Sequence, residues 1–146
     1  MSTLVVDASV AVKWALPETD GEEDVAQALA LLTAFQRSKV NLLQPPHWLA
    51  EVTAVIARLR PEIAAEATTL FHTLDLPVAD DLEVYLRGCT LATELHHHLF
   101  DTLYHAVALE KGATFVTADT RYWRKARSHG AIRLLRELDL GGANGP

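Results

Sequence analysis

Four acidic residues stand where carboxylates could do chemistry: Asp7, Glu51, Asp101 and Asp119. Asp7 directly follows a short apolar run, and Asp119 comes two residues after a second apolar run that ends at Thr117. Four carboxylates close together would repel one another and raise each other's pKa. A divalent cation removes that penalty, and Mg²⁺ and Mn²⁺ both prefer carboxylate and water oxygens as ligands. If the fold brings the four acids together, the chemistry expected is that of a metal site.

Each acid also has an ordinary structural explanation. Aspartate is a favoured helix N-cap, and Asp7, Asp101 and Asp119 each stand at or just before an expected helix start. Glu51 could lie on the solvated flank of an amphipathic helix. Its apolar neighbours on the helical wheel, however, put it at the boundary of the core, where a charge needs a partner. The four acids in combination favour a common site.

The elements that would position these acids alternate between strands and helices. This alternation predicts a parallel α/β sheet with helices on both faces, in which ligands bind beyond the carboxyl ends of the strands. The expected strands are 3–6, 40–43, 113–117 and 132–135. The expected helices are 8–16, 22–38, 46–60, 62–74, 80–95, 101–111 and 120–128.

Local signals set several boundaries and faces. Pro17 should stop the first helix. Thr19 and Asp20, each followed three residues later by glutamate, form a capping-box signature for the second. The expected apolar, core-facing side chains of helix 80–95 are Leu82, Tyr85, Leu86, Cys89 and Ala92.

Length and composition indicate one domain. The chain has 146 residues, and we expect residues 1–138 to form the domain and the glycine-rich residues 139–146 a flexible tail. A single cysteine and the lack of a signal-peptide pattern indicate a cytoplasmic protein. The net charge of −6 is unusual for a nucleic-acid binder, but six of the 13 basic residues fall within 121–136.

Four short motifs carry a resemblance to a known family. They are VVDASV at 5–10, PHWLAEV at 46–52, FDTLYHAVA at 100–108 and FVTAD at 115–119. With these motifs in this order, the chain resembles the PIN-domain ribonucleases over about residues 3–135, and among them the VapC toxins of type II toxin–antitoxin pairs. The resemblance implies a three-layer α/β/α fold with a central, mostly parallel sheet of four to five strands.

The resemblance also implies a role for each matching residue. Asp7 and Asp101 would be direct ligands of one or two Mg²⁺ ions, with Mn²⁺ as a substitute. Glu51 and Asp119 would act directly or through water. The supporting hydroxyls would be those of Ser9 and Thr117.

The implied activity is hydrolysis of RNA phosphodiester bonds, leaving a 5′-phosphate and a 3′-hydroxyl. The implied partner is a VapB-like antitoxin. A homodimer is also expected, and the apolar faces of 22–38 and 46–60 offer a surface for the antitoxin or for a second copy of the chain. Arg121, Arg124 and Lys125 could bind the RNA, or could form only a solvated helix face. The alternative function is a catalytically silent PIN module that acts by binding RNA or the antitoxin. A phosphatase with an aspartyl nucleophile is disfavoured because no second acid stands two positions after Asp7.

The histidines and the cysteine have less specific interpretations. His96, His97 and His98 are consecutive, so on a helix they point about 100° apart and are expected to form a polar helix end. His105, one turn after Asp101, could face the site, although a packed histidine is the favoured interpretation. Cys89 is expected in the core.

Overall fold

The computed structural model describes residues 1–16 and 22–140. Its four strands form one parallel sheet in the order β2-β1-β3-β4. The strands are β1 (Ser2–Val6), β2 (Val40–Leu42), β3 (Thr114–Thr117) and β4 (Ile132–Leu134). The signals at Pro17, Thr19 and Asp20, and the tail after residue 140, lie outside the described residues.

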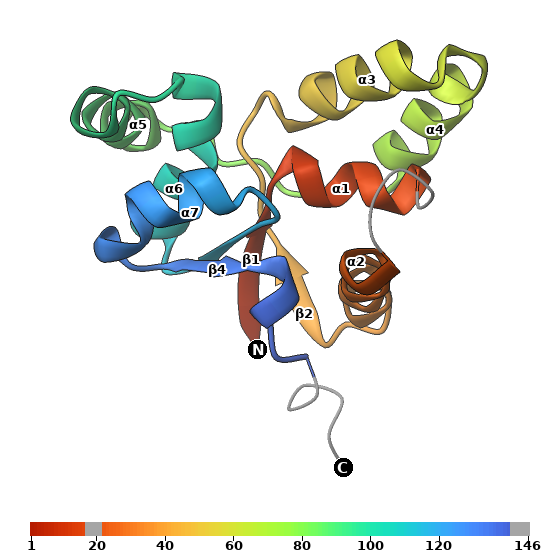
Figure 1. Ribbon diagram of the computed structural model, residues 1–146, viewed down its shortest axis with the longest axis horizontal. Coiled ribbons are helices and arrows are strands. Elements are labelled where there is room, and N and C mark those ends of the chain that lie inside the picture. The colour runs from red at the N-terminus through yellow and green to blue at the C-terminus, as the bar shows by residue number, and fades with distance from the viewer. Residues whose placement is uncertain (17–21, 141–146) are drawn as a thin grey trace.

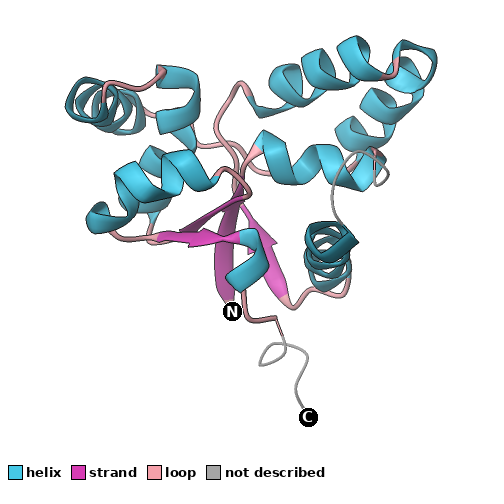
Figure 2. Cartoon of the chain, viewed as in Figure 1, coloured by secondary structure: helices cyan, strands magenta, loops and turns pink. Residues whose placement is uncertain are grey.

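Helices cover both faces of the sheet. Figure 1 shows α1 to α4 on one side of the strands and α5 to α7 on the other, and Figure 2 shows the magenta strands between the two groups. The helices are α1 (Ala8–Ala15), α2 (Glu22–Gln36), α3 (Trp48–Leu59), α4 (Pro61–Thr73), α5 (Leu82–Leu95), α6 (Leu99–Lys111) and α7 (Thr120–Ala126), with the short 3₁₀ turns η2 (Arg127–His129) and η3 (Leu135–Glu137). This architecture confirms the predicted three-layer α/β/α fold.

The two central strands are the most deeply buried. Val5 and Val6 of β1 and Val116 of β3 have no exposed surface, as expected for apolar runs buried on both faces. Within the sheet, β2 lies on one side of β1 and β3 lies on the other. The carboxyl ends of β1 and β3 therefore flank the point where the strand order reverses, which is where open α/β sheets bind ligands.

A glutamine side chain extends the ladder beyond the end of β2. Gln44 is 1% exposed; its Oε1 accepts the N–H of Val6 at 2.7 Å and its Nε2 donates to the carbonyl of Val6 at 2.8 Å. The amide thus satisfies both backbone groups of the last β1 residue. Because Asp7 follows immediately, Gln44 holds the backbone from which Asp7 projects.

The prediction for the buried face of α5 was wrong. Leu82, Tyr85, Leu86 and Cys89 are exposed, whereas the residues that pack inward are Val84, Gly88 and Leu91. The reason is the close approach of α6: a Cβ built on Gly88 would lie 2.9 Å from Leu103 Cδ2, and Thr102 Oγ1 donates to the Gly88 carbonyl at 2.9 Å. Helix α5 therefore faces α6 with the side that carries Gly88, because a glycine leaves room for the neighbouring helix.

Several boundaries differ slightly from the expected ones. Helix α6 begins at Leu99, two residues early, so Asp101 lies within its first turn instead of starting it. At the other end of the chain, packing continues to Leu140, which is 5% exposed. On α3, Trp48, Val52 and Ile56 are buried, whereas Leu49 and Val55 are half-buried and Leu59 is exposed. No helix in the described ranges is long and apolar enough to cross a membrane.

Candidate active site at the carboxyl edge of the sheet

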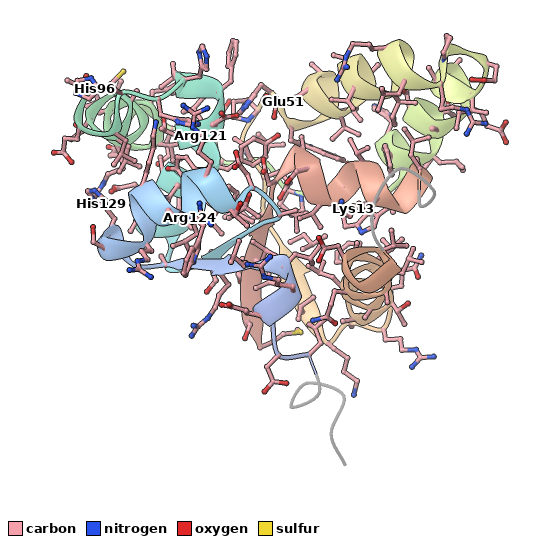
Figure 3. The ribbon with its side chains drawn as sticks, viewed as in Figure 1. Lys13, Glu51, His96, Arg121, Arg124 and His129 are labelled. Carbon is pink, nitrogen blue, oxygen red and sulfur yellow. The ribbon has the colours of Figure 1, made fainter. Side chains whose placement is uncertain are left out.

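The four predicted acids line one hollow, which we call the acidic hollow. It has a volume of about 540 Å³ and lies at the carboxyl ends of β1 and β3. Its polar lining residues are Asp7, Ser9, Lys13, Asp24, Glu51, Asp101 and Asp119. Figure 3 labels Glu51 on α3 and Lys13 on α1, two of the helices that surround this edge. The fold therefore brings together acids separated by up to 112 positions in the sequence.

Two hydroxyl groups hold the carboxylate of Asp7. Ser9 Oγ donates to Asp7 Oδ2 at 2.7 Å, and Thr117 Oγ1 donates to the same oxygen at 2.8 Å. Although Asp7 is the N-cap residue of α1, its side chain makes no capping hydrogen bond. The structure thus places Ser9 and Thr117 beside Asp7, and Oδ1 has no hydrogen bond within the described chain.

Burial disfavours the charged forms of two of the acids. Burial raises the pKa of Asp7 to about 6, against its two hydrogen bonds and with a smaller contribution from the charges of Asp101 and Asp119. Burial likewise raises the pKa of Glu51 to about 7, with Asp7 and Asp101 adding to the effect. The hollow therefore concentrates negative charge that a bound cation would compensate.

The Glu51 side chain is held by a buried tyrosine. Tyr104 OH donates to Glu51 Oε1 at 2.8 Å, and Tyr104 has no exposed surface. The pKa of Tyr104 is raised above its usual range, chiefly by burial and then by the charge of Glu51, so the phenol stays a donor. Glu51 is consequently oriented by the core and is not a freely solvated flank residue.

A histidine and a lysine extend from Asp101 away from the hollow. His97 Nε2 lies 2.8 Å from Asp101 Oδ2, and His97 Nδ1 lies 3.1 Å from Lys125 Nζ. An ammonium group can only donate, so Nδ1 accepts from Lys125 and Nε2 carries the proton that it donates to Asp101. The three side chains form one directed hydrogen-bonded chain.

Asp119 does serve as a helix cap. Its Oδ1 accepts the backbone N–H groups of Arg121 and Tyr122 at 3.0 and 3.1 Å, and its own N–H donates to Thr117 Oγ1 at 3.0 Å. The capping explanation therefore holds for Asp119, although Asp7 and Asp101 make no side-chain caps. Because Asp119 Oδ1 accepts the hydrogen bonds from α7, Asp119 Oδ2 is the oxygen left for a ligand in the hollow.

The donor set is chemically suited to a hard divalent cation. It consists of carboxylate and hydroxyl oxygens, which Mg²⁺ and Mn²⁺ prefer. Among the described residues, however, no three carboxylate, imidazole or thiol groups are gathered closely enough to form a ready-made metal group. Water would thus have to complete the coordination of an ion, as is usual for Mg²⁺.

The predicted basic residues occupy two environments. Arg121 and Lys125 line a second hollow beside the acidic one, together with His96, His97 and His98. Arg124 is exposed on the same helix and lines neither hollow. Figure 3 shows Arg121 and Arg124 at separate positions along α7.

His105 lies in the core. It has no exposed surface; Tyr122 OH donates to its Nδ1 at 3.0 Å, and its Nε2 donates to the Gly130 carbonyl at 2.7 Å. Burial lowers its pKa, so the neutral ring persists. The favoured interpretation of His105 as a packed histidine is confirmed, and the ring does not line the acidic hollow.

Four lining or supporting residues escaped the sequence reasoning: Lys13, Asp24, His97 and Tyr104. Tyr104 could have been found, because it lies three residues after Asp101 and so one helical turn away. His97 was interpreted only as part of a polar helix end. Its contact depends on His96, which adopts a left-handed conformation (φ 51°) and turns the chain between α5 and α6. Lys13 forms part of a Lys13-Trp14 pair that resembles one bacterial branch of the family, but neither Lys13 nor Asp24 was predicted to line the site.

Comparison with known proteins agrees with this architecture. The family model of the PIN domain matches residues 4–128, a range that includes all four acids. No curated protein matches the sequence. A chain in the crystal structure of FitAcB from Neisseria gonorrhoeae has a similar fold, with a TM-score of 0.61 and 16% sequence identity over 92% of this chain and 99% of that chain. The chain belongs to the PIN domain family.

Proposed function

We propose that this chain is a divalent-metal-dependent endoribonuclease and the toxin of a VapBC-type toxin–antitoxin pair. The observation that carries the proposal is the acidic hollow, in which Asp7, Glu51, Asp101 and Asp119 meet at the carboxyl edge of the sheet. PIN domains are generally nucleases, which supports a nuclease role. The four VapC-like motifs support the toxin assignment.

In this proposal Asp7 and Asp101 bind one or two Mg²⁺ ions directly, with Mn²⁺ as a substitute, and Glu51 and Asp119 bind directly or through water. When bound, the cation would lower the pKa of water and offset negative charge on the scissile phosphate. Ser9 and Thr117 fix Asp7 through Oδ2, so the other carboxylate oxygen keeps its ligand capacity.

Glu51 has the properties of a proton acceptor. In the metal-free protein burial raises its pKa to about 7, and a bound cation would lower that pKa, so the carboxylate would be ionised at neutral pH and able to accept a proton from an attacking water. The hydrogen bond from Tyr104 fixes the carboxylate while leaving Oε2 for that proton. In this proposal Glu51 therefore binds the metal ion, directly or through water, and can also act as a general base.

The proposed partners follow from the charge of the hollow. A VapB-like antitoxin should cover it with a basic side chain, because an arginine or lysine would be attracted to the four carboxylates gathered there. RNA would approach with Arg121, Arg124 and Lys125 near its phosphates. A homodimer completes the proposed assembly, and the cytoplasm is its proposed location.

The test is cleavage of single-stranded RNA by the purified protein with Mg²⁺, with Mn²⁺ and with EDTA. We expect cuts only with a divalent ion, and products with a 5′-phosphate and a 3′-hydroxyl. Binding of RNA without turnover in any metal would instead support the silent PIN module. The same cutting in EDTA would contradict the metal-dependent mechanism.

A further inference from the structure

A second hollow lies against the acidic one and has the opposite chemistry. It has a volume of about 440 Å³ and is lined by Ala92, His96, His97, His98, Arg121 and Lys125. We call it the basic hollow. No carboxylate among the described residues lines it, although the chain has a net charge of −6.

The two cations of the basic hollow differ in how they are held. The Arg121 side chain makes no hydrogen bond or ion pair within the described residues, although the Arg121 backbone N–H is fixed by Asp119. Lys125 donates to His97 Nδ1 at 3.1 Å and lies 3.4 Å from the carbonyl of His96. Neither partner of Lys125 is an anion, so neither cation is compensated by an anion in the described chain.

The two hollows share a wall. His97 lines the basic hollow, and its Nε2 donates to Asp101, which lines the acidic one. The His97 side chain is only 11% exposed, so the wall is packed in place. Asp119 and Arg121 are two residues apart in the sequence, and Asp119 lines the acidic hollow while Arg121 lines the basic one. A ligand in the basic hollow would thus sit directly beside the acid site.

We propose that the basic hollow binds a backbone phosphate of the RNA strand, next to the phosphodiester that lies in the acidic hollow. This inference rests on the proposed function and specifies how the same site holds its substrate. Guanidinium pairs with phosphate through two parallel hydrogen bonds, and an unpaired Arg121 beside Lys125 provides that geometry with a second charge. The acidic hollow repels a polyanion, so a phosphate anchor at its edge would keep the strand in place.

An acidic peptide from a protein partner is the competing occupant. The strand that presents a phosphodiester to the acid site must carry its adjacent phosphates past the shared wall. A peptide has no such connection to the acidic hollow. The position of the basic hollow therefore favours RNA.

The test measures the affinity of the intact protein for a short labelled single-stranded RNA by fluorescence anisotropy, in EDTA so that no cleavage occurs. The variant is Arg121→Gln. The matched control is Arg37→Gln, an exposed arginine in the turn between α2 and β2, at the opposite edge of the sheet. Both variants remove one charge, so a difference between them reports position rather than net charge.

We expect Arg121→Gln to weaken RNA binding about tenfold, the usual effect of losing a charged hydrogen bond. The slope of log K against log salt concentration should also become shallower by about 0.7, the value for one phosphate contact on a single strand. Arg37→Gln should change neither quantity. Equal slopes for the wild type and Arg121→Gln, with RNA still cut in Mg²⁺, would overturn this inference while leaving the proposed nuclease intact.

Replacing one charged phosphate of the RNA by an uncharged linkage shows which phosphate Arg121 contacts. A methylphosphonate is placed at successive positions of the RNA, and each oligonucleotide is measured with the wild type and Arg121→Gln. At one position next to the cleavage site, the losses of binding free energy caused by the methylphosphonate and by Arg121→Gln should not be additive, because each change removes the same contact between Arg121 and the phosphate. Additive losses at every position, or Arg121-dependent binding of an octaglutamate peptide without any effect on RNA, would overturn the inference in favour of the peptide. A wild-type protein that neither binds nor cuts RNA would refute the proposed function as well.

Discussion

His97 donates a hydrogen bond from Nε2 to Asp101 Oδ2 across the turn between α5 and α6, at 2.8 Å. The ammonium group of Lys125 on the other side of the ring fixes which nitrogen carries the proton. Partners of this kind orient a carboxylate and leave its second oxygen for a metal. The relationship makes His97 a positioning residue for Asp101 in the proposed site.

Replacing His97 should therefore impair RNA cleavage without abolishing it. In His97→Ala, Asp101 loses its orienting donor, and we expect a loss of about 10- to 100-fold in cleavage rate, as is typical for the outer partners of metal ligands. The concentration of Mn²⁺ needed for half-maximal cleavage should rise as well. Rate measurements across a Mn²⁺ titration test this prediction.

His72→Ala is the control for that experiment, because His72 is exposed on α4, away from the acidic hollow. It should cleave like the wild type. If His97→Ala required no more Mn²⁺ than the wild type, His97 would have no role in positioning Asp101.

The apo protein should become less stable as the pH rises through neutrality. The folded-state pKa of Glu51 is about 7, above the 4.5 of an unperturbed glutamate, so the folded state binds this proton more tightly than the unfolded state does. The stabilising contribution is fully present below about pH 4.5 and is lost as the pH rises through 7. Glu51→Gln removes the charge and keeps an acceptor for Tyr104 OH, so at pH 8 it should melt about a few degrees above the wild type.

Thermal denaturation in EDTA at pH 8 and pH 4 measures this difference, which should disappear at pH 4. Glu66→Gln, an exposed position on α4, controls for net charge and should have no such pH dependence. A Glu51→Gln variant less stable than the wild type at pH 8 would show that the glutamate charge is not destabilising.

Mn²⁺ should stabilise the folded protein, and more so at high pH. A ligand that binds only the folded state adds about 2.7 kcal/mol at a hundred times its Kd. Because Asp7 and Glu51 have pKa values of about 6 and 7, the ion must displace protons below these values. The rise in melting temperature with Mn²⁺ should thus be large at pH 8 and small at pH 5, and a rise of equal size at both would place the ion elsewhere.

Gln44 should contribute to both stability and site geometry. In Gln44→Leu, the N–H and carbonyl of Val6 lose their side-chain partners in a buried position, at a cost of about 1–3 kcal/mol for each unpaired group. Urea denaturation should show this loss. Because Asp7 follows Val6, cleavage by the folded variant should also fall, whereas Gln36→Leu, exposed at the end of α2, should leave both quantities unchanged.

Much of this arrangement follows from local sequence. The continuous apolar runs before Asp7 and Thr117 predict strands buried on both faces, and parallel strands necessarily share a carboxyl edge. The sequence pattern therefore implies that Asp7 and Asp119 share an edge of the sheet, and their proximity follows from the adjacency of β1 and β3 in the structure. Glu51 and Asp101 were assigned by family resemblance, since helix periodicity alone gives no direction toward that edge.

The remainder depends on tertiary packing. The apolar stripe that includes Leu82 and Leu86 has the larger side chains, yet α5 packs through Gly88 because only that face lets α6 approach closely. The contact of His97 with Asp101 depends on the left-handed residue His96 between two helices. Neither effect is encoded in the hydrophobic period of one segment.

The central claim is that the four carboxylates form the catalytic site, and isosteric substitution tests it most directly. The rate of RNA cleavage in Mg²⁺ is measured for the wild type, Asp7→Asn and Asp101→Asn, each shown to be folded by its thermal transition. A metal site contributes several kcal/mol to the transition state, so both variants should lose at least about 100-fold in rate. Cleavage at the wild-type rate by either pure, folded variant would contradict the account.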